Sequence, residues 1–166
     1  RHFVEETDRV LLDLSLDHFR RCLEQGTEPV SFEPAGPRRR TFFDPSKLKA
    51  AVVTCGGLCP GLNDVIRAVV NELHYIYGVR TIYGVKYGLQ GFVPDYGHDL
   101  VELTPDAVAD IHSLGGTVLG SSRGQQDVGT ICDCLDRMNI RLLFMIGGDG
   151  TLKAAQRIYQ EITDRQ

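Results

Sequence analysis

Two short apolar runs that each lead directly into a glycine-rich segment constrain the fold of this chain most strongly. Residues 50–54 (Ala-Ala-Val-Val-Thr) precede the glycine-rich segment 55–61. Residues 142–146 (Leu-Leu-Phe-Met-Ile) precede the glycine-rich segment 147–150. Apolar and β-branched runs of this length are typical of strands buried on both faces. Because a helical pattern follows each glycine-rich segment, the sequence predicts an α/β fold: a parallel sheet wound with helices on both faces, as in a Rossmann-like three-layer sandwich.

Further elements follow from hydrophobic periodicity and from cap signals. Thr104, Pro105 and Asp106 place a hydroxyl, a proline and an acid at successive positions, which is typical of a helix start. We expect that helix to end near Ser113, and we expect Asn63 to cap an earlier helix. The expected helices cover residues 62–75, 104–113, 128–138 and 151–162, and the remaining expected strands cover residues 79–85 and 117–119.

The first part of the chain has a different character. Residues 1–47 are expected to form an N-terminal extension, followed by an α/β domain at residues 48–166. Apolar positions predict one short helix within residues 11–26 of the extension. Prolines then break regular structure ahead of three consecutive arginines at 38–40. We interpret these arginines as a solvated turn, because the chain around them is acidic.

The overall composition excludes several classes of protein. The 166 residues suffice for one ordinary domain, and with 42% hydrophobic and 24% charged residues a packed core is expected. The net charge of -4 argues against a general binder of nucleic acid, which needs a basic face. No apolar run approaches the roughly 20 residues that a membrane-spanning helix needs, so we expect no membrane association.

The cysteines and the first residue bear on compartment and completeness. An odd number of cysteines at spacings unlike those of zinc sites favours reduced thiols and a cytoplasmic location. The chain begins with Arg1 rather than Met, so we expect it to be part of something longer. The five cysteines are Cys22, Cys55, Cys59, Cys132 and Cys134.

The segment Cys55–Gly61 is the first candidate binding loop. Three glycines allow the backbone to approach an anion closely, and the helix that follows presents free N–H groups at the same place. Phosphate is the natural ligand of such a loop. A tight turn without a ligand explains the glycines about as well. The loop has neither the lysine of a Walker motif nor the GxGxxG spacing.

Two further loops add charged side chains. Asp149 lies among glycines at 147–150, and a carboxylate beside a phosphate requires a cation between them. Asp149 therefore indicates magnesium, although a simple helix cap is the alternative. Arg123 in the loop 120–124 offers a planar fork of donors suited to phosphate oxygens.

Four ordered motifs in this chain together resemble the amino-terminal half of the 6-phosphofructokinase family. They are TCGGLCPGLNDVIR at 54–67, YGLQGF at 87–92, GGTVLGSSRG at 115–124 and IGGDGT at 146–151. The segment AGPRRRTFF at 35–43 is similar to the preamble of the branch found in plants, trypanosomatids and some bacteria. The resemblance covers roughly residues 32–163 and implies a phosphofructokinase-like N-terminal domain.

The resemblance implies a role for eight residues. Arg123 matches the arginine that neutralises phosphate near the transferred group, and Asp149 matches the magnesium-linked aspartate. Gly150 stands where pyrophosphate-dependent members usually carry a second aspartate that obstructs the α-phosphate of ATP, so ATP is the expected donor. For Lys153 two interpretations stay open: it adds positive charge at the phosphates, or it is solvated. The residues expected to bind the nucleotide are Gly57, Tyr87, Arg123, Gly124, Gly148, Asp149, Gly150 and Thr151.

The implied reaction is a glycolytic phosphoryl transfer from Mg-ATP to the 1-hydroxyl of fructose 6-phosphate. The TxDxD-type catalytic loop of the family is not found in this sequence, so the chain alone is expected to be inactive. The family also implies a homo-oligomer, a dimer or a tetramer. Three alternatives stay open: a pyrophosphate-dependent phosphofructokinase, a relative of NAD or lipid kinases that share the GGDGT loop, and a non-catalytic nucleotide-binding module.

Overall fold

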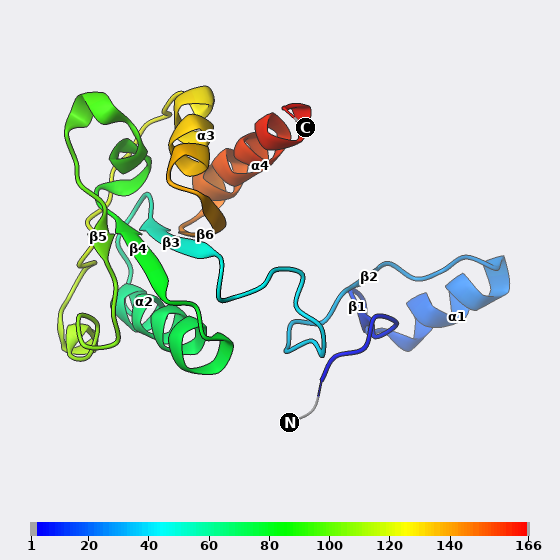
Figure 1. Cartoon of the computed structure of the whole chain (residues 1–166). Coiled ribbons are helices and arrows are strands. Elements are labelled where there is room, and N and C mark those ends of the chain that lie inside the picture. The colour runs from blue at the N-terminus through cyan, green and yellow to red at the C-terminus, as the bar shows by residue number, and fades with distance from the viewer. Residues whose placement is uncertain (1–2, 166) are drawn as a thin grey trace. The chain divides into compact units, whose positions relative to one another are not determined.

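The computed structural model describes residues 3–165 of the chain. These residues divide into two compact units, Arg1–Phe43 and Asp44–Gln166 by their outer bounds (Figure 1). Among the described residues, no helix combines the length and the apolar character that crossing a bilayer requires.

The first unit contains one helix and one small sheet. Strand β1 (Val10–Leu11) pairs antiparallel with β2 (Ser31–Phe32), and helix α1 (Leu16–Gln25) lies between them in the sequence. The predicted end of this helix is confirmed, because Gly26 closes it with a left-handed φ of 63°. Its start is later than predicted: the Ser15 side chain caps the helix, and the residues before it are taken up by β1.

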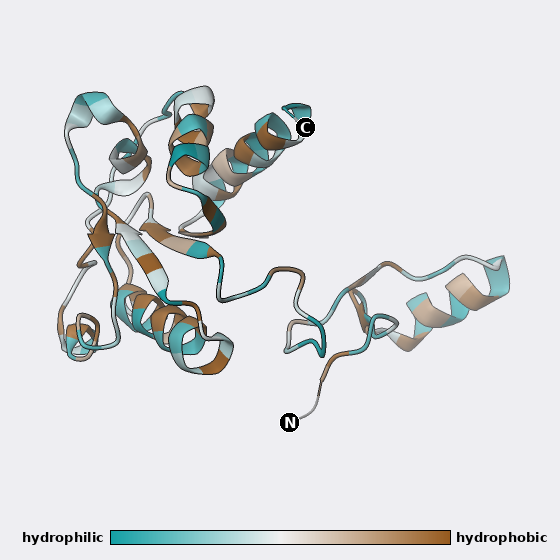
Figure 2. Ribbon diagram, in the orientation of Figure 1, coloured by the Kyte–Doolittle hydropathy of each residue, from teal (hydrophilic) through white to brown (hydrophobic). Residues whose placement is uncertain are grey.

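The apolar stripe predicted for the first unit is present but lies largely at the surface of that unit. Apolar and polar residues alternate along α1 (Figure 2). Only Cys22 is buried in this helix, whereas Leu14 just before it is 82% exposed and Leu23 is 65% exposed. Among its described residues, 3–43, the unit therefore has no substantial core.

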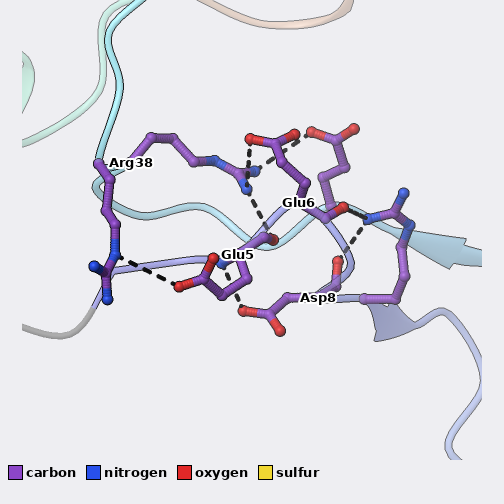
Figure 3. Close-up of polar contacts among 7 residues, drawn as sticks. Glu5, Glu6, Asp8 and Arg38 are labelled. Carbon is purple, nitrogen blue, oxygen red and sulfur yellow. Dashed lines mark hydrogen bonds and ion pairs between the residues drawn. The ribbon is translucent and has the colours of Figure 1, made fainter.

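The basic turn of the first unit is neutralised by acids (Figure 3). The Arg38 Nη1 atom donates to the Glu5 carbonyl oxygen at 3.1 Å, and Arg38 Nη2 lies 3.5 Å from a Glu33 carboxylate oxygen. Arg39 Nε lies 3.7 Å from a Glu5 carboxylate oxygen. These pairings agree with the interpretation of the arginines as a turn rather than a nucleic-acid-binding patch.

The second unit is built on a four-stranded sheet in the order β5-β4-β3-β6. Strands β4 and β6 both run parallel to the central β3, while β5 pairs antiparallel with β4 at one edge. The α/β fold class is confirmed, and the single antiparallel edge strand makes the sheet mixed rather than wholly parallel. The strands are β3 (Lys49–Thr54), β4 (Thr81–Val85), β5 (Val101–Glu102) and β6 (Ile140–Ile146).

Helices cover both faces of this sheet (Figure 1). On one face Ala50 and Val52 of β3 pack with residues of α2 (Leu62–Asn71). On the other face Ala51 and Val53 pack with residues of α3 (Val128–Arg137) and α4 (Asp149–Asp164). Successive side chains of a strand point to opposite faces, and residues 50–53 are wholly buried, so the two-sided burial predicted for this run is confirmed.

Helix α2 follows a different course from the prediction. Gly61, not Asn63, occupies its N-cap position, and no side chain caps it. Past Asn71 the helix continues as a π-helix over Glu72–Tyr77. Asn63 is a buried residue within the first turn, and its side chain bonds to a distant segment, as described below.

Two predicted elements between β5 and α3 do not form. The Thr104 hydroxyl does accept from the Ala107 N–H at 3.1 Å, but no α-helix propagates from it, and only the 3₁₀ turn η4 (Ile111–Ser113) follows. Burial of Leu103, Val108 and Ile111 in the core bends the chain, which overrides the local helix signal. Residues 117–119 do not form a strand, because the N–H groups of Val118 and Leu119 bond to the side chains of Asn63 and Thr117. The Leu119 carbonyl accepts from the Tyr87 N–H, outside any strand pairing.

The short turns after β4 complete the fold. They are the 3₁₀ helices η2 (Gly88–Phe92) and η3 (Pro94–Tyr96).

Candidate functional site

Three loops predicted to bind phosphate lie against one another. The loops after β3 and β6 meet because the strands are parallel neighbours, and the Cys55 N–H donates to the Ile146 carbonyl at 2.8 Å. The loop 120–124 joins them through two bonds. The Ser121 hydroxyl donates to the Gly56 carbonyl at 2.6 Å, and the Gly56 N–H donates to the Ser122 carbonyl at 3.2 Å.

These loops enclose a cleft of about 450 Å³ together with helices α3 and α4. The cleft brings together six of the eight predicted nucleotide-binding residues. They are Gly57, Arg123, Gly124, Gly148, Gly150 and Thr151.

Positive charge dominates the lining of this cleft. Arg123, Lys153 and Arg157 all line it, and none of the described residues that line it is an Asp or a Glu. The N-terminus of α4, at Asp149, adds unpaired N–H groups and the positive end of the helix dipole. The cleft is therefore suited to a polyanion.

The glycines of the 147–150 loop fall into two kinds. A Cβ at Gly147 would collide with the Thr151 side chain and lie 2.7 Å from the Cys55 carbonyl oxygen, so packing requires glycine there. A Cβ at Gly148, Gly150 or Gly57 would meet no atom within 4 Å. Since packing leaves room for a side chain at these three positions, their glycines keep the cleft open rather than allow the chain to fold.

Asp149 lies at the edge of the site rather than in its lining. It is the first residue of α4, and it is exposed. The described part of the chain contains no group of three or more His, Cys, Asp or Glu side chains placed to hold a metal ion. A single carboxylate still fits magnesium that takes its other ligands from phosphate and water.

Tyr87, the other predicted residue outside the lining, packs elsewhere. Its backbone is left-handed, with φ 58°, and its ring centroid lies 4.5 Å from that of His98. Its ring also covers Gly120, where a Cβ would lie 2.9 Å from a Tyr87 ring carbon. The ring thus rests against the base of the Arg123 loop.

Part of the lining was not predicted from the sequence. Arg157 lies one helical turn beyond Lys153 on α4, and its Nη1 donates to the Gln125 Oε1 at 2.9 Å. The four-residue spacing of these two cations, starting just after the glycine loop, places them on one helix face and was a usable signal. Gln125 and Gln126 also line the cleft. Their position depends on the path of the chain after the loop 120–124, and no local sequence pattern indicates that path.

Cys55 also lines the cleft, but as a neutral group. Burial raises the pKa of its thiol from 9.0 to about 11, and a backbone hydrogen bond with Leu89 opposes this in part. The thiol therefore stays protonated near neutral pH and adds no negative charge beside the cations.

Comparison with known proteins agrees with this geometry. A family model described as "Phosphofructokinase" matches residues 49–164. An ATP-dependent 6-phosphofructokinase of Borreliella burgdorferi is 48% identical over 166 residues, covering 99% of this chain and 36% of the relative. One of Amycolatopsis methanolica is 48% identical over 154 residues, covering 93% of this chain and 33% of the relative. The chain thus spans about a third of the length of these curated relatives.

Solved structures show the same fold. Phosphofructokinase of Pichia pastoris in the T-state superposes with a TM-score of 0.62 at 32% identity, covering 76% of this chain and 13% of that one. A pyrophosphate-dependent phosphofructokinase of Marinobacter aquaeolei superposes with a TM-score of 0.61 at 20% identity, covering 71% of this chain and 30% of that one. The second likeness concerns the fold alone.

Proposed function

This chain belongs to the phosphofructokinase family, and from that premise we propose that residues 48–166 form the ATP-binding domain of an ATP-dependent 6-phosphofructokinase. The complete enzyme transfers the γ-phosphoryl group of Mg-ATP to the 1-hydroxyl of fructose 6-phosphate. The observation that supports this most directly is the meeting of three glycine-bearing loops and three cations at one cleft.

The role of this domain is to position and neutralise the phosphates. Arg123 presents a charged fork of donors from the loop 120–124, where it neutralises charge that develops during transfer. The N–H groups at the start of α4 and the backbone at Gly57 bind phosphate oxygens directly. Phosphoryl transfer depends largely on such positioning and electrostatic stabilisation, so these groups supply much of what the donor side of the reaction requires.

Asp149 is the residue that would hold Mg²⁺. Its exposed carboxylate stands at the positive end of α4, at the border of the cationic cleft. The ion, when bound, neutralises part of the phosphate charge that would otherwise repel this carboxylate. In this proposal Asp149 would hold the ion, while Thr151 and the flanking glycines contact the phosphates.

Gly150 favours ATP over pyrophosphate as the donor. The space beside Gly150 is open, since a Cβ at this residue would meet no atom within 4 Å. A carboxylate at this position would project into space that the α-phosphate of ATP needs. The two curated relatives that are 48% identical to this chain are named ATP-dependent, which supports ATP as the donor.

The sugar side of the reaction lies outside these 166 residues in this proposal. No TxDxD-type sequence occurs in the chain, so the group that accepts the proton of the sugar hydroxyl must come from elsewhere in the enzyme. We place the enzyme in the cytoplasm as a homo-oligomer. All five cysteines are free in the described structure, which fits a reducing compartment.

Equilibrium binding of Mg-ATP to the chain, followed by calorimetry, tests the proposal. Arg123→Ala should weaken binding at least about tenfold, because it removes a charge-assisted contact to phosphate. Arg141→Ala is the matched control. That arginine lies near the start of β6, at the end of the strand away from the glycine loop, and bonds to Asn139. Equal affinities for the two variants would contradict the proposed site.

Donor choice is tested separately at Gly150. Gly150→Asp should abolish ATP binding and spare pyrophosphate binding, whereas Gly150→Ala should leave ATP binding within about threefold, given the free space there. If both variants lose binding of both ATP and pyrophosphate, Gly150 is needed for folding and does not select the donor.

A further inference from the structure

The loop that carries Arg123 has little regular structure to hold it. Between β5 and α3, the described residues contain no strand and no α-helix, only the 3₁₀ turn η4. Buried backbone N–H and C=O groups nonetheless need partners. The partners of this segment therefore decide where the arginine lies.

Asn63 supplies two of those partners. Its side chain is 2% exposed and belongs to the first turn of α2. The Nδ2 donates to the Leu114 carbonyl at 2.9 Å, and the Oδ1 accepts from the Val118 N–H at 2.9 Å. One amide group thus satisfies both a carbonyl and an N–H of a segment more than fifty residues further along the chain.

A second buried polar side chain continues this clamp toward the loop. The Thr54 hydroxyl, on a residue 1% exposed at the end of β3, lies 2.7 Å from the Gly120 carbonyl and 2.9 Å from the Thr117 hydroxyl. Ser121 then bonds to Gly56. From Leu114 to Ser122 the segment is therefore fastened to the elements on either side of the first glycine loop.

We propose that Asn63 is a positioning residue that sets the place of Arg123 in the nucleotide cleft by holding residues 114–118 against α2. The inference rests on the proposed function, because it assigns Asn63 a part in nucleotide binding. Asn63 touches no ligand in this account and acts only through the loop it holds.

The chemistry of the two bonds requires an amide. In an Asn63→Asp variant, the isosteric carboxylate would still accept from the Val118 N–H but would set an oxygen against the Leu114 carbonyl oxygen. The Leu114 carbonyl would then lose its donor, and the two facing oxygens would repel each other. This substitution should therefore displace the segment while changing almost no volume.

Hydrogen exchange tests the clamp in the unchanged chain. The Val118 amide lies outside every strand and helix, yet its bond to the buried Asn63 predicts exchange at least about a hundredfold slower than that of an exposed loop amide. Exchange of Val118 at the rate of exposed loop amides would overturn the proposal without any variant.

A double-mutant cycle tests the link to Arg123. Asn63→Asp should raise the Kd for Mg-ATP about tenfold in the unchanged background and less than about twofold in an Arg123→Ala background. A purely structural effect would give the same ratio in both backgrounds, which would overturn the proposal. Ile66→Val, a change at a buried residue of the same helix, should lower stability without changing the Kd.

Failure of the inference is distinguishable from failure of the proposed function. If the unchanged chain does not bind Mg-ATP, the proposed function and the nucleotide role of Asn63 are both overturned. If the chain binds Mg-ATP and Arg123→Ala weakens binding, but the two positions show no coupling, only the inference is overturned.

Discussion

The proposed nucleotide cleft has two regions in which glycine has opposite surroundings. In the packed seam (Cys55, Gly147 and Thr151), glycine allows two loops to touch, since a Cβ at 147 would lie 2.7 Å from the Cys55 carbonyl oxygen. In the open mouth (Gly57, Gly148 and Gly150), a Cβ would touch nothing. Adjacent glycines in one motif can therefore be required by packing or have free space around them, and only the surrounding structure distinguishes the two cases.

The largest effect on stability is expected in the packed seam. Gly147→Ala forces a methyl group against a backbone carbonyl and the Thr151 side chain, so the free energy of unfolding should fall by about 2–3 kcal/mol. Gly148→Ala, one residue on, should cost well under about 1 kcal/mol, because its Cβ has room. Urea denaturation of both variants measures the contrast. Similar losses in the two would remove the distinction between seam and mouth.

A smaller, pH-dependent effect is expected from Cys55 in the same seam. Its thiol has a pKa raised from 9.0 to about 11 by burial. Between these values the unfolded chain loses the proton and the folded chain keeps it, so stability should fall as pH rises from about 9 to about 11.

Urea denaturation from pH 8 to pH 11 under reducing conditions measures this fall. Cys55→Ala should make the decline shallower. Cys59→Ala, at the exposed cysteine of the same loop, serves as the matched control and should leave it unchanged. An identical decline in all three proteins would mean that Cys55 is not buried as the seam requires.

The smallest effect on stability is expected in the open mouth. Gly57→Ala should change the free energy of unfolding by no more than about 0.5 kcal/mol, since the position has free space and no left-handed backbone. Its Mg-ATP affinity should nevertheless fall, because in our proposal the backbone at Gly57 contacts a phosphate directly and a methyl group there would crowd that contact. Gly56→Ala is the informative neighbour. With φ 81° and free space, it isolates the cost of backbone strain, about 1 kcal/mol.

Local pattern predicted most of the regular elements and the site loops. The runs at 50–54 and 142–146 form β3 and β6, and helices follow both glycine loops. The helix expected from Thr104 failed even though its first cap bond forms, because burial of Ile111 and its neighbours bends the chain. The prediction that Asn63 caps a helix was also wrong. Its side chain bonds to residues more than fifty positions away, and no local pattern indicates such partners.

By itself, the sequence determined the order of most strands, loops and helices, the glycine-rich loops and the family, because these depend on residues close together along the chain. The tertiary structure alone decided which glycines leave space and what holds Arg123. Those properties depend on distances between segments that are remote in sequence, and such distances arise only when the core packs.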